Sequence, residues 1–141
     1  MYDVEEEYTR YVAQVGGRII SSDQPAEEIR EARTSMGIIQ EELGRLMSRR
    51  RETISRIENG SINPTFDFVT KFCSTIAAAK VVRDLQALEE VYHLSGKEVT
   101  PLSLGILRPY FDIPPKDLEI IFRIGVRGYR KSRNKIIASM K

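Results

Sequence analysis

Side chains that could perform catalysis or hold a metal are few in this chain of 141 residues. It has one cysteine, Cys73, and one histidine, His93, too few for an internal disulfide or a Cys/His zinc site. The carboxylates at 5–7 and 89–90 have no His, Ser or Lys at a spacing typical of a catalytic pair. Gly16-Gly17 is not sufficient for a nucleotide-binding loop. We therefore expect no enzyme, no cofactor and no metal, and we interpret Cys73 as a core residue.

The basic residues, in contrast, are concentrated in two runs, although Lys and Arg total 22 against 20 for Asp and Glu. The first quarter of the chain is acidic, and the basic runs follow in the middle and at the end. They comprise Arg45, Arg49, Arg50, Arg51 and Arg56, then Arg123, Arg127, Arg130, Lys131, Arg133, Lys135 and Lys141. Such a distribution is typical of a surface that faces a polyanion; a solvated charged face is the alternative interpretation of either run.

The hydrophobic pattern around these residues predicts helices. A first helix over 4–15 should end at Gly16-Gly17, and 18–22 should form an extended arm or edge strand. A second helix should start near Asp23 or Ser22, with Pro25 in its first turn. The remaining short helices are predicted over 39–47, over 50–58 with a stop at Asn59-Gly60, and after Pro64. These elements make a compact all-α unit.

Beyond residue 77 the pattern changes to a seam with alternating spacings of three and four. Its members are Ala78, Val81, Leu85, Leu88 and Tyr92. Further helices should follow Pro101 and Pro114-Pro115, the latter carrying Leu118, Ile121, Phe122, Val126 and Tyr129. The predicted organisation is an N-terminal helix and arm over 1–22, a compact unit over 23–78 and a helical region over 79–141.

Residues 29–76 carry several side chains at informative spacings. Arg33 precedes Gln40 by seven positions, Gln40 precedes Glu58 by eighteen, and 53–60 reads TISRIENG. This stretch resembles the helix-turn-helix domain of the Cro/XRE family of phage-repressor-like transcriptional regulators. The resemblance implies an all-α, lambda-repressor-like domain that binds double-stranded DNA, followed here by a small helical dimerisation tail.

The predicted helix over 50–58 would then be the recognition helix. A helix in the major groove presents side chains to base edges from its N-terminal half and one stripe. Those positions hold Arg50, Arg51, Glu52 and Arg56, so we expect them to contact bases. Arginine donates two bonds to guanine, and glutamate accepts from cytosine. The alternative is a solvated helix whose arginines only aid solubility.

Other residues of the domain are expected to bind phosphates or to hold the fold. The resemblance implies a phosphate contact for Gln40 at a helix N-terminus and an ion pair between Arg33 and Glu58. Further expected phosphate contacts are Arg49, Thr53 and Asn59. The presence of Asn59 is equally well explained by a left-handed residue that ends the helix.

The turn before the recognition helix departs from the family pattern, which has glycine followed by an apolar residue. Here Ser48 and Arg49 stand in those places. Because serine disfavours a positive φ, we expect a remodelled turn in which Ser48 caps the following helix and Arg49 points outward.

A single small DNA-binding module rarely gives strong specificity, so we expect a homodimer that reads a pseudo-palindromic operator. The expected interface comprises Val81, Leu85, Leu88, Tyr92, Leu118, Ile121 and Phe122. The alternatives are an antitoxin-like or adaptor protein whose tail binds another protein, and an RNA- or ribosome-associated factor that depends on Arg127 and Arg130. No apolar run is long enough to span a membrane, and we expect a cytoplasmic repressor.

Overall fold

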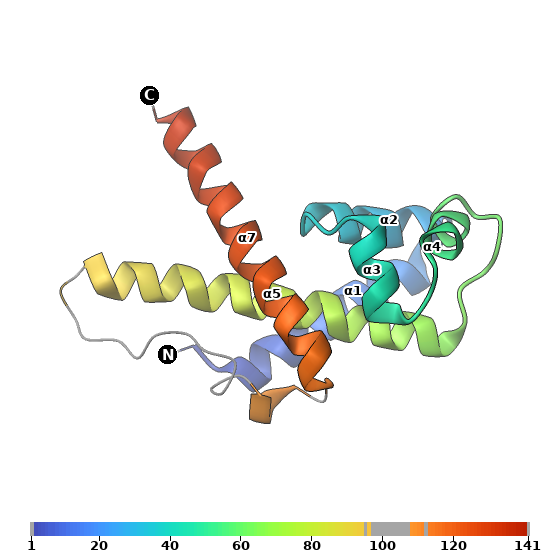
Figure 1. Cartoon of the computed structure of the whole chain (residues 1–141), viewed down its shortest axis with the longest axis horizontal. Coiled ribbons are helices and arrows are strands. Elements are labelled where there is room, and N and C mark those ends of the chain that lie inside the picture. The colour runs from blue at the N-terminus through green and yellow to red at the C-terminus, as the bar shows by residue number, and fades with distance from the viewer. Residues whose placement is uncertain (1, 95, 97–107, 112, 141) are drawn as a thin grey trace. The chain divides into compact units, whose positions relative to one another are not determined.

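The computed structural model describes residues 2–94, 96, 108–111 and 113–140, in which all regular structure is helical (Figure 1). The all-α prediction is therefore confirmed. The chain divides into two compact units, Met1–Ala78 and Ala79–Lys141. The helix expected after Pro101 lies outside the described residues.

The first unit begins with α1 (Val4–Ser21), which runs through both glycines. The predicted arm over 18–22 is therefore wrong for 18–21, which are helical. Each interior glycine costs about 1 kcal/mol relative to alanine. Burial of Ile19, one turn after buried Val15, offsets this with about 1.5–3 kcal/mol. At its N-terminus, Asp3 Oδ1 accepts the Glu6 N–H at 3.1 Å and fixes the start of α1.

Three shorter helices follow: α2 (Pro25–Ser35), α3 (Gln40–Met47) and α4 (Arg51–Glu58). Helix α2 packs on α1, and α4 packs on both α2 and α3 (Figure 1). The N-cap of α2 is Gln24 rather than Asp23 or Ser22, and Gly37 after the helix has a φ of 70°. The apolar sides of these helices meet in a core that includes Ile29, Leu43, Leu46 and Ile54.

Helix α5 (Phe66–Leu94) is one continuous element of 29 residues. It starts two residues after Pro64, where Thr65 Oγ1 accepts the N–H of Phe68 at 3.1 Å. Its first half contributes Phe72 and Ile76 to the core of the first unit. Cys73 is buried there as predicted, and burial raises the pKa of its thiol.

The second unit combines the remainder of α5 with η1 (Arg108–Tyr110) and α7 (Pro115–Ser139). Helix α7 crosses α5 (Figure 1). At Gly125 of α7 an added Cβ would lie 2.5 Å from Val82 Cβ of α5. The glycine therefore allows a close approach of two helices rather than ending one. No helix among the described residues is long and apolar enough to cross a membrane.

Candidate nucleic-acid interface

The turn between α3 and α4 has the geometry of a glycine turn although serine occupies it. Ser48 has φ 54° and ψ 46°, the left-handed conformation that the sequence argument considered unfavourable for serine. The Arg49 N–H then donates to the Gly44 carbonyl at 2.8 Å and closes α3. The expected cap at Ser48 is therefore wrong, because Ser48 ends α3 and Arg50 is the N-cap of α4 without a side-chain bond.

Gly44, in the middle of α3, makes this turn possible. A Cβ at this position would lie 2.6 Å from the Arg49 carbonyl oxygen, closer than real Cβ atoms come to backbone. Gly44 does not stand out in the sequence, because a glycine inside a helical pattern indicates only a weak helix former. Its role follows only from the backbone that passes over it.

Helix α4 has a buried side and an exposed side. Ile54, Ile57 and Glu58 are buried. The opposite side bears Arg51, Glu52 and Arg56, all exposed, with half-buried Ser55 between them. Together with Gln40 these four residues line a shallow hollow of about 350 Å³. Three of the four expected base-contacting residues therefore share one surface, and the fourth, Arg50, is exposed just before the helix.

Ser55 is a member of this surface that the sequence argument missed. It lies three residues after Glu52 and four after Arg51, the spacing that places helical side chains on one face. This spacing could have identified it. A serine hydroxyl both donates and accepts hydrogen bonds and can contact any base.

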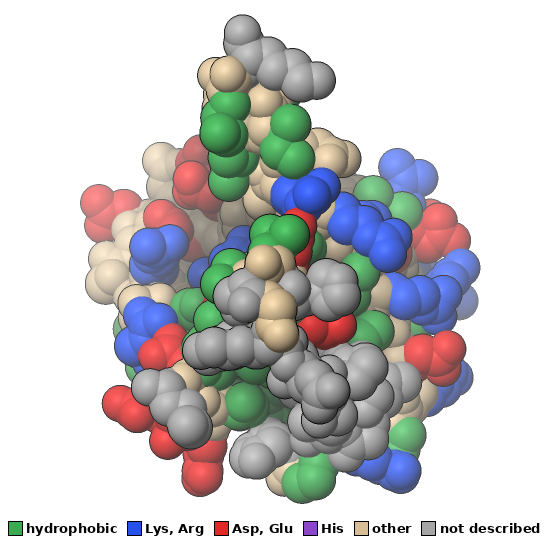
Figure 2. All heavy atoms as spheres, turned by 90° about the vertical axis from the view of Figure 1, so that its left-hand side faces the viewer, with side chains coloured by type: hydrophobic (Ala, Val, Ile, Leu, Met, Phe, Trp, Pro, Cys, Tyr) green, Lys and Arg blue, Asp and Glu red, His purple; other side chains and the backbone are tan. Residues whose placement is uncertain are grey.

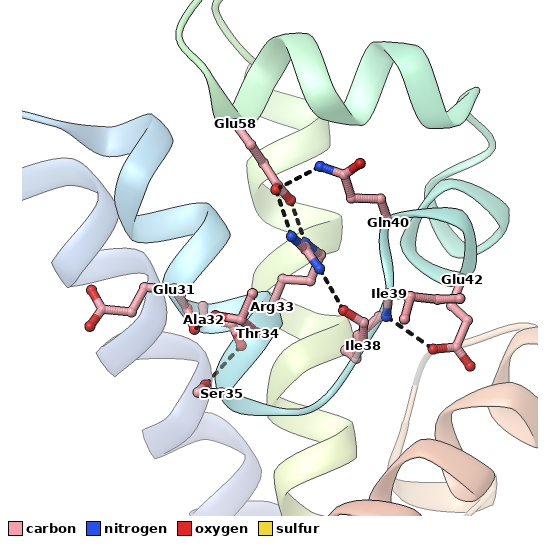
Figure 3. A network of polar contacts seen from close by, with 10 residues as sticks. All are labelled: Glu31, Ala32, Arg33, Thr34, Ser35, Ile38, Ile39, Gln40, Glu42 and Glu58. Carbon is pink, nitrogen blue, oxygen red and sulfur yellow. Dashed lines mark hydrogen bonds and ion pairs between the residues drawn. The ribbon is translucent and has the colours of Figure 1, made fainter.

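A buried network behind α4 fixes the helix relative to α2 and α3 (Figure 3). Arg33 Nε donates to Glu58 Oε2 at 2.6 Å, and Arg33 Nη2 donates to Glu58 Oε1 at 2.8 Å. Arg33 Nη1 also donates to the Ile38 carbonyl at 2.7 Å, which holds the chain between α2 and α3. The expected pair between Arg33 and Glu58 is present and two-pronged, the geometry in which arginine binds carboxylate best.

Gln40, the first residue of α3, joins this network. Its Nε2 donates to Glu58 Oε1 at 3.2 Å (Figure 3). An amide nitrogen has two hydrogens, so the second remains for another acceptor. Just before it, the Ile39 N–H donates to Glu42 Oε1 at 3.1 Å, whereas the Ile39 side chain has no acceptor and forms no cap.

The other expected phosphate-contacting residues lie around this surface. Arg49 is exposed and donates from Nη1 to the Ser48 carbonyl at 3.1 Å. Thr53 is half-buried and does not line the hollow. Asn59 is exposed, and its Oδ1 accepts the Ser61 N–H at 2.9 Å. Its φ is −95°, so the left-handed residue is Gly60 instead, with φ 81°.

The expected dimer residues divide by burial. Val81, Leu118 and Ile121 are buried within the single chain, so they present no surface to a second copy. Leu85, Leu88 and Phe122 are half-buried, and the side chain of Tyr92 lies outside the described residues.

Comparison with known proteins bears on the first unit. Residues 29–76 match the model of a helix-turn-helix family. The match supports, for this segment, the resemblance to a helix-turn-helix domain of the Cro/XRE type. The match covers α2 to α4 and the first part of α5, the elements that carry the hollow and the buried network. No curated protein and no solved structure matches the chain significantly.

Proposed function

We propose that this protein is a sequence-specific DNA-binding transcriptional regulator that places α4 in the major groove. The observation that carries the proposal is the exposed face of α4, where Arg51, Glu52 and Arg56 surround one hollow. Side chains on such a face reach base edges, and a bidentate arginine discriminates against a wrong base by about 1–3 kcal/mol.

The surroundings of α4 support the same function. A helix N-terminus favours an anion, and Gln40 is the first residue of α3. Exposed Arg49 and Arg50 lie in the turn that leads into α4. We propose that Gln40, Arg49, Thr53 and Asn59 bind phosphates on both sides of the groove and set the depth of α4, and that Arg50 contacts bases.

The proposed regulator acts as a homodimer on a pseudo-palindromic site. One small domain of this type covers about 600–1,000 Å² of DNA-binding surface, which limits its specificity. A two-fold dimer doubles this surface and reads two half-sites about one helical turn apart, or a multiple of a turn.

Selection of bound duplexes from random DNA at physiological salt tests this function. We expect the wild type to enrich an inverted repeat. Arg51→Ala should lose preference at one position in each half-site, by roughly 5- to 150-fold. Arg10→Ala is the matched control. It removes the same charge from an exposed position on α1 and should leave the selected sequence unchanged.

Two results would contradict the proposal. One is salt-sensitive binding without any enriched sequence, which indicates phosphate contact alone. The other is an identical enriched sequence for the wild type and Arg51→Ala, which would remove α4 from base recognition.

A further inference from the structure

Helix α7 carries a concentration of positive charge outside the segment that matches the helix-turn-helix family. After Glu119 the helix contains no acidic residue, whereas six lysines and arginines lie between positions 123 and 135. One of them, Arg133, donates from Nε to Glu90 Oε1 at 2.6 Å, so its charge is compensated. The other five are all exposed and form what we call the α7 basic row: Arg123, Arg127, Arg130, Lys131 and Lys135.

Most of the α7 basic row is accessible to a partner. Arg130, Lys131 and Lys135 have no ion pair within the part of the chain that the structure describes. Arg123 has only a long contact of 3.9 Å with Glu119, and its side chain is 70% exposed. Every residue of α7 from 130 to 140 is exposed. Figure 2 shows this end of the helix at the top, with Lys and Arg side chains beneath its apolar tip.

The stability of α7 does not account for this row. Four of its members follow one another at intervals of four residues: Arg123, Arg127, Lys131 and Lys135. At this spacing like charges repel each other and destabilise a helix. The helix dipole favours cations only within the last turn, and the last turn of α7 has no basic residue. A bound polyanion, in contrast, would relieve the repulsion along the whole row.

The length of the row fits a nucleic-acid backbone. At a rise of about 1.5 Å per residue, positions 123 to 135 extend over roughly 18 Å. One strand of a DNA duplex carries a phosphate about every 3.4 Å along the axis, so the row can lie beside about five phosphates. Lysine and arginine bind such phosphates without reading the base sequence, and each contact releases condensed counter-ions.

Two other polyanions fit the row less well. A helix that lies in a membrane surface presents large apolar side chains along its length beside its cations. Between positions 123 and 135, all of which are described, no large apolar side chain is exposed. RNA has a similar backbone charge, but the first unit contains the segment that matches a family of DNA-binding domains. Double-stranded DNA is therefore the polyanion that the observations favour.

We propose that the α7 basic row is a second nucleic-acid contact, which binds the phosphates of double-stranded DNA independently of sequence. The contacts come from Arg123, Arg130, Lys131 and Lys135. Arg127 already has an interaction within the chain and is not counted among them. The row adds affinity for any duplex and leaves the choice of sequence to α4. The inference rests on the proposed function, because that function brings duplex DNA to the protein.

The salt dependence of binding to a duplex of unselected sequence, measured by fluorescence anisotropy on the full-length protein, tests the contact. The triple variant Arg130→Gln/Lys131→Gln/Lys135→Gln removes three charges and keeps residues of good helix propensity. The slope of log K against log salt concentration should become shallower by about 2.7 for each bound chain, since each phosphate contact contributes about 0.9. Between about 50 and 200 mM salt, the wild type should therefore lose roughly 40-fold more affinity than this variant.

The matched control is Arg10→Gln/Arg18→Gln/Lys71→Gln. It changes the net charge by the same amount, at exposed positions of the first unit that do not line the hollow around α4. Its salt slope should differ from that of the wild type by less than one phosphate contact, about 0.9. Thermal unfolding without DNA, followed by circular dichroism, should show that the α7 variant is at least as stable as the wild type, because repulsion along the helix is reduced.

Two results would overturn the inference. One is a salt slope of the α7 variant on duplex DNA that equals the slope of the control. In that case, a loss of binding to single-stranded RNA or to phosphatidylserine vesicles would identify a different polyanion as the partner. The other result is an α7 variant that is clearly less stable than the wild type or does not fold, because the row would then serve the fold.

The selection from random DNA separates this inference from the proposed function. If the wild type and the α7 variant enrich the same sequence and differ in salt slope as expected, both are supported. A wild type that enriches no sequence, yet has a salt slope that depends on the row, supports the second contact and contradicts the function. An enriched sequence together with an unchanged slope has the reverse meaning.

Discussion

Glu58 is the residue on which the position of α4 depends. Its carboxylate accepts two bonds from Arg33 and one from Gln40. The side chains of Arg33 and Glu58 are only 10% and 3% exposed. Among the described residues no buried side-chain nitrogen or oxygen lacks a hydrogen-bond partner. Water therefore contributes little to the stabilisation of these two charges, and each charge depends on the other for its stabilisation.

Removal of one charge from this pair should strongly destabilise the protein. Glu58→Gln leaves the Arg33 guanidinium buried without a counter-charge, and we expect a loss of about 3–5 kcal/mol in the free energy of unfolding. Urea denaturation followed by circular dichroism measures it. The comparison is Glu41→Gln, which breaks the exposed pair with Arg45 at 3.3 Å and should cost less than about 1 kcal/mol. Equal losses in the two variants would contradict the role of burial.

Residue spacing predicts part of this site. The positions of Arg33 and Glu58 match a family pattern, so their pairing could be expected before the structure was known. The bond between Gln40 and Glu58 could not, because it depends on how α3 begins relative to the end of α4. The conformation of Ser48 could not be predicted for a related reason: the left-handed region costs roughly 1–2 kcal/mol, and two helices that fix the turn between them outweigh this cost.

At the scale of elements, glycines have different effects because their neighbours differ. Gly17 has no atom within 4 Å of an added Cβ, whereas Gly44 has a backbone oxygen at 2.6 Å. Both lie inside helices. Sequence alone gives both the same weak helix propensity and cannot separate them.

The two glycines should therefore respond oppositely to alanine. Gly17→Ala should stabilise α1 by about 0.5–1 kcal/mol, because alanine loses less backbone entropy. Gly44→Ala should destabilise the domain by about 1–3 kcal/mol, since the turn must move away from α3. Thermal unfolding of both variants measures the difference. A stabilised Gly44→Ala would show that the turn does not depend on this contact.

Helix existence and order were predictable from hydrophobic periodicity, and helix length was not. The sequence predicts a stop at Gly16-Gly17, and for the helix after Pro114-Pro115 it predicts apolar positions only as far as Tyr129. The structure instead contains α1 through residue 21 and α7 through residue 139. In α1, burial of Ile19 outweighs the propensity of two glycines, and that burial depends on the fold around it.

At the scale of the whole molecule, the second unit should supply association and the first unit recognition. A chain of residues 1–78 retains the core around Ile29, Leu43, Ile54 and Phe72. We expect it to unfold cooperatively as a monomer and to bind the selected inverted repeat roughly 100-fold or more weakly, since two linked half-sites bind with avidity. Light scattering and fluorescence anisotropy measure the two properties. A truncated chain that still dimerises would contradict this division.

The division could be predicted only in outline. The change in pattern after residue 77 lies close to the boundary between the units at residues 78 and 79. The seam and the helix after Pro114-Pro115 together predict a dimer interface. The structure instead buries Val81 of the seam, and Leu118 and Ile121 of α7, within one chain. Amphipathicity shows that a helix face is covered and does not show by what.

The placement of Cys73 gives the DNA-binding unit an internal chemical reporter. It is the chain's single thiol, it is buried on α5, and its Sγ would lie 3.7 Å from a Cβ at Gly16 of α1. Because only the thiolate reacts and burial opposes its formation, a thiol reagent can modify this protein only when the first unit opens. The rate of modification therefore counts openings of that unit, without any label having to be introduced.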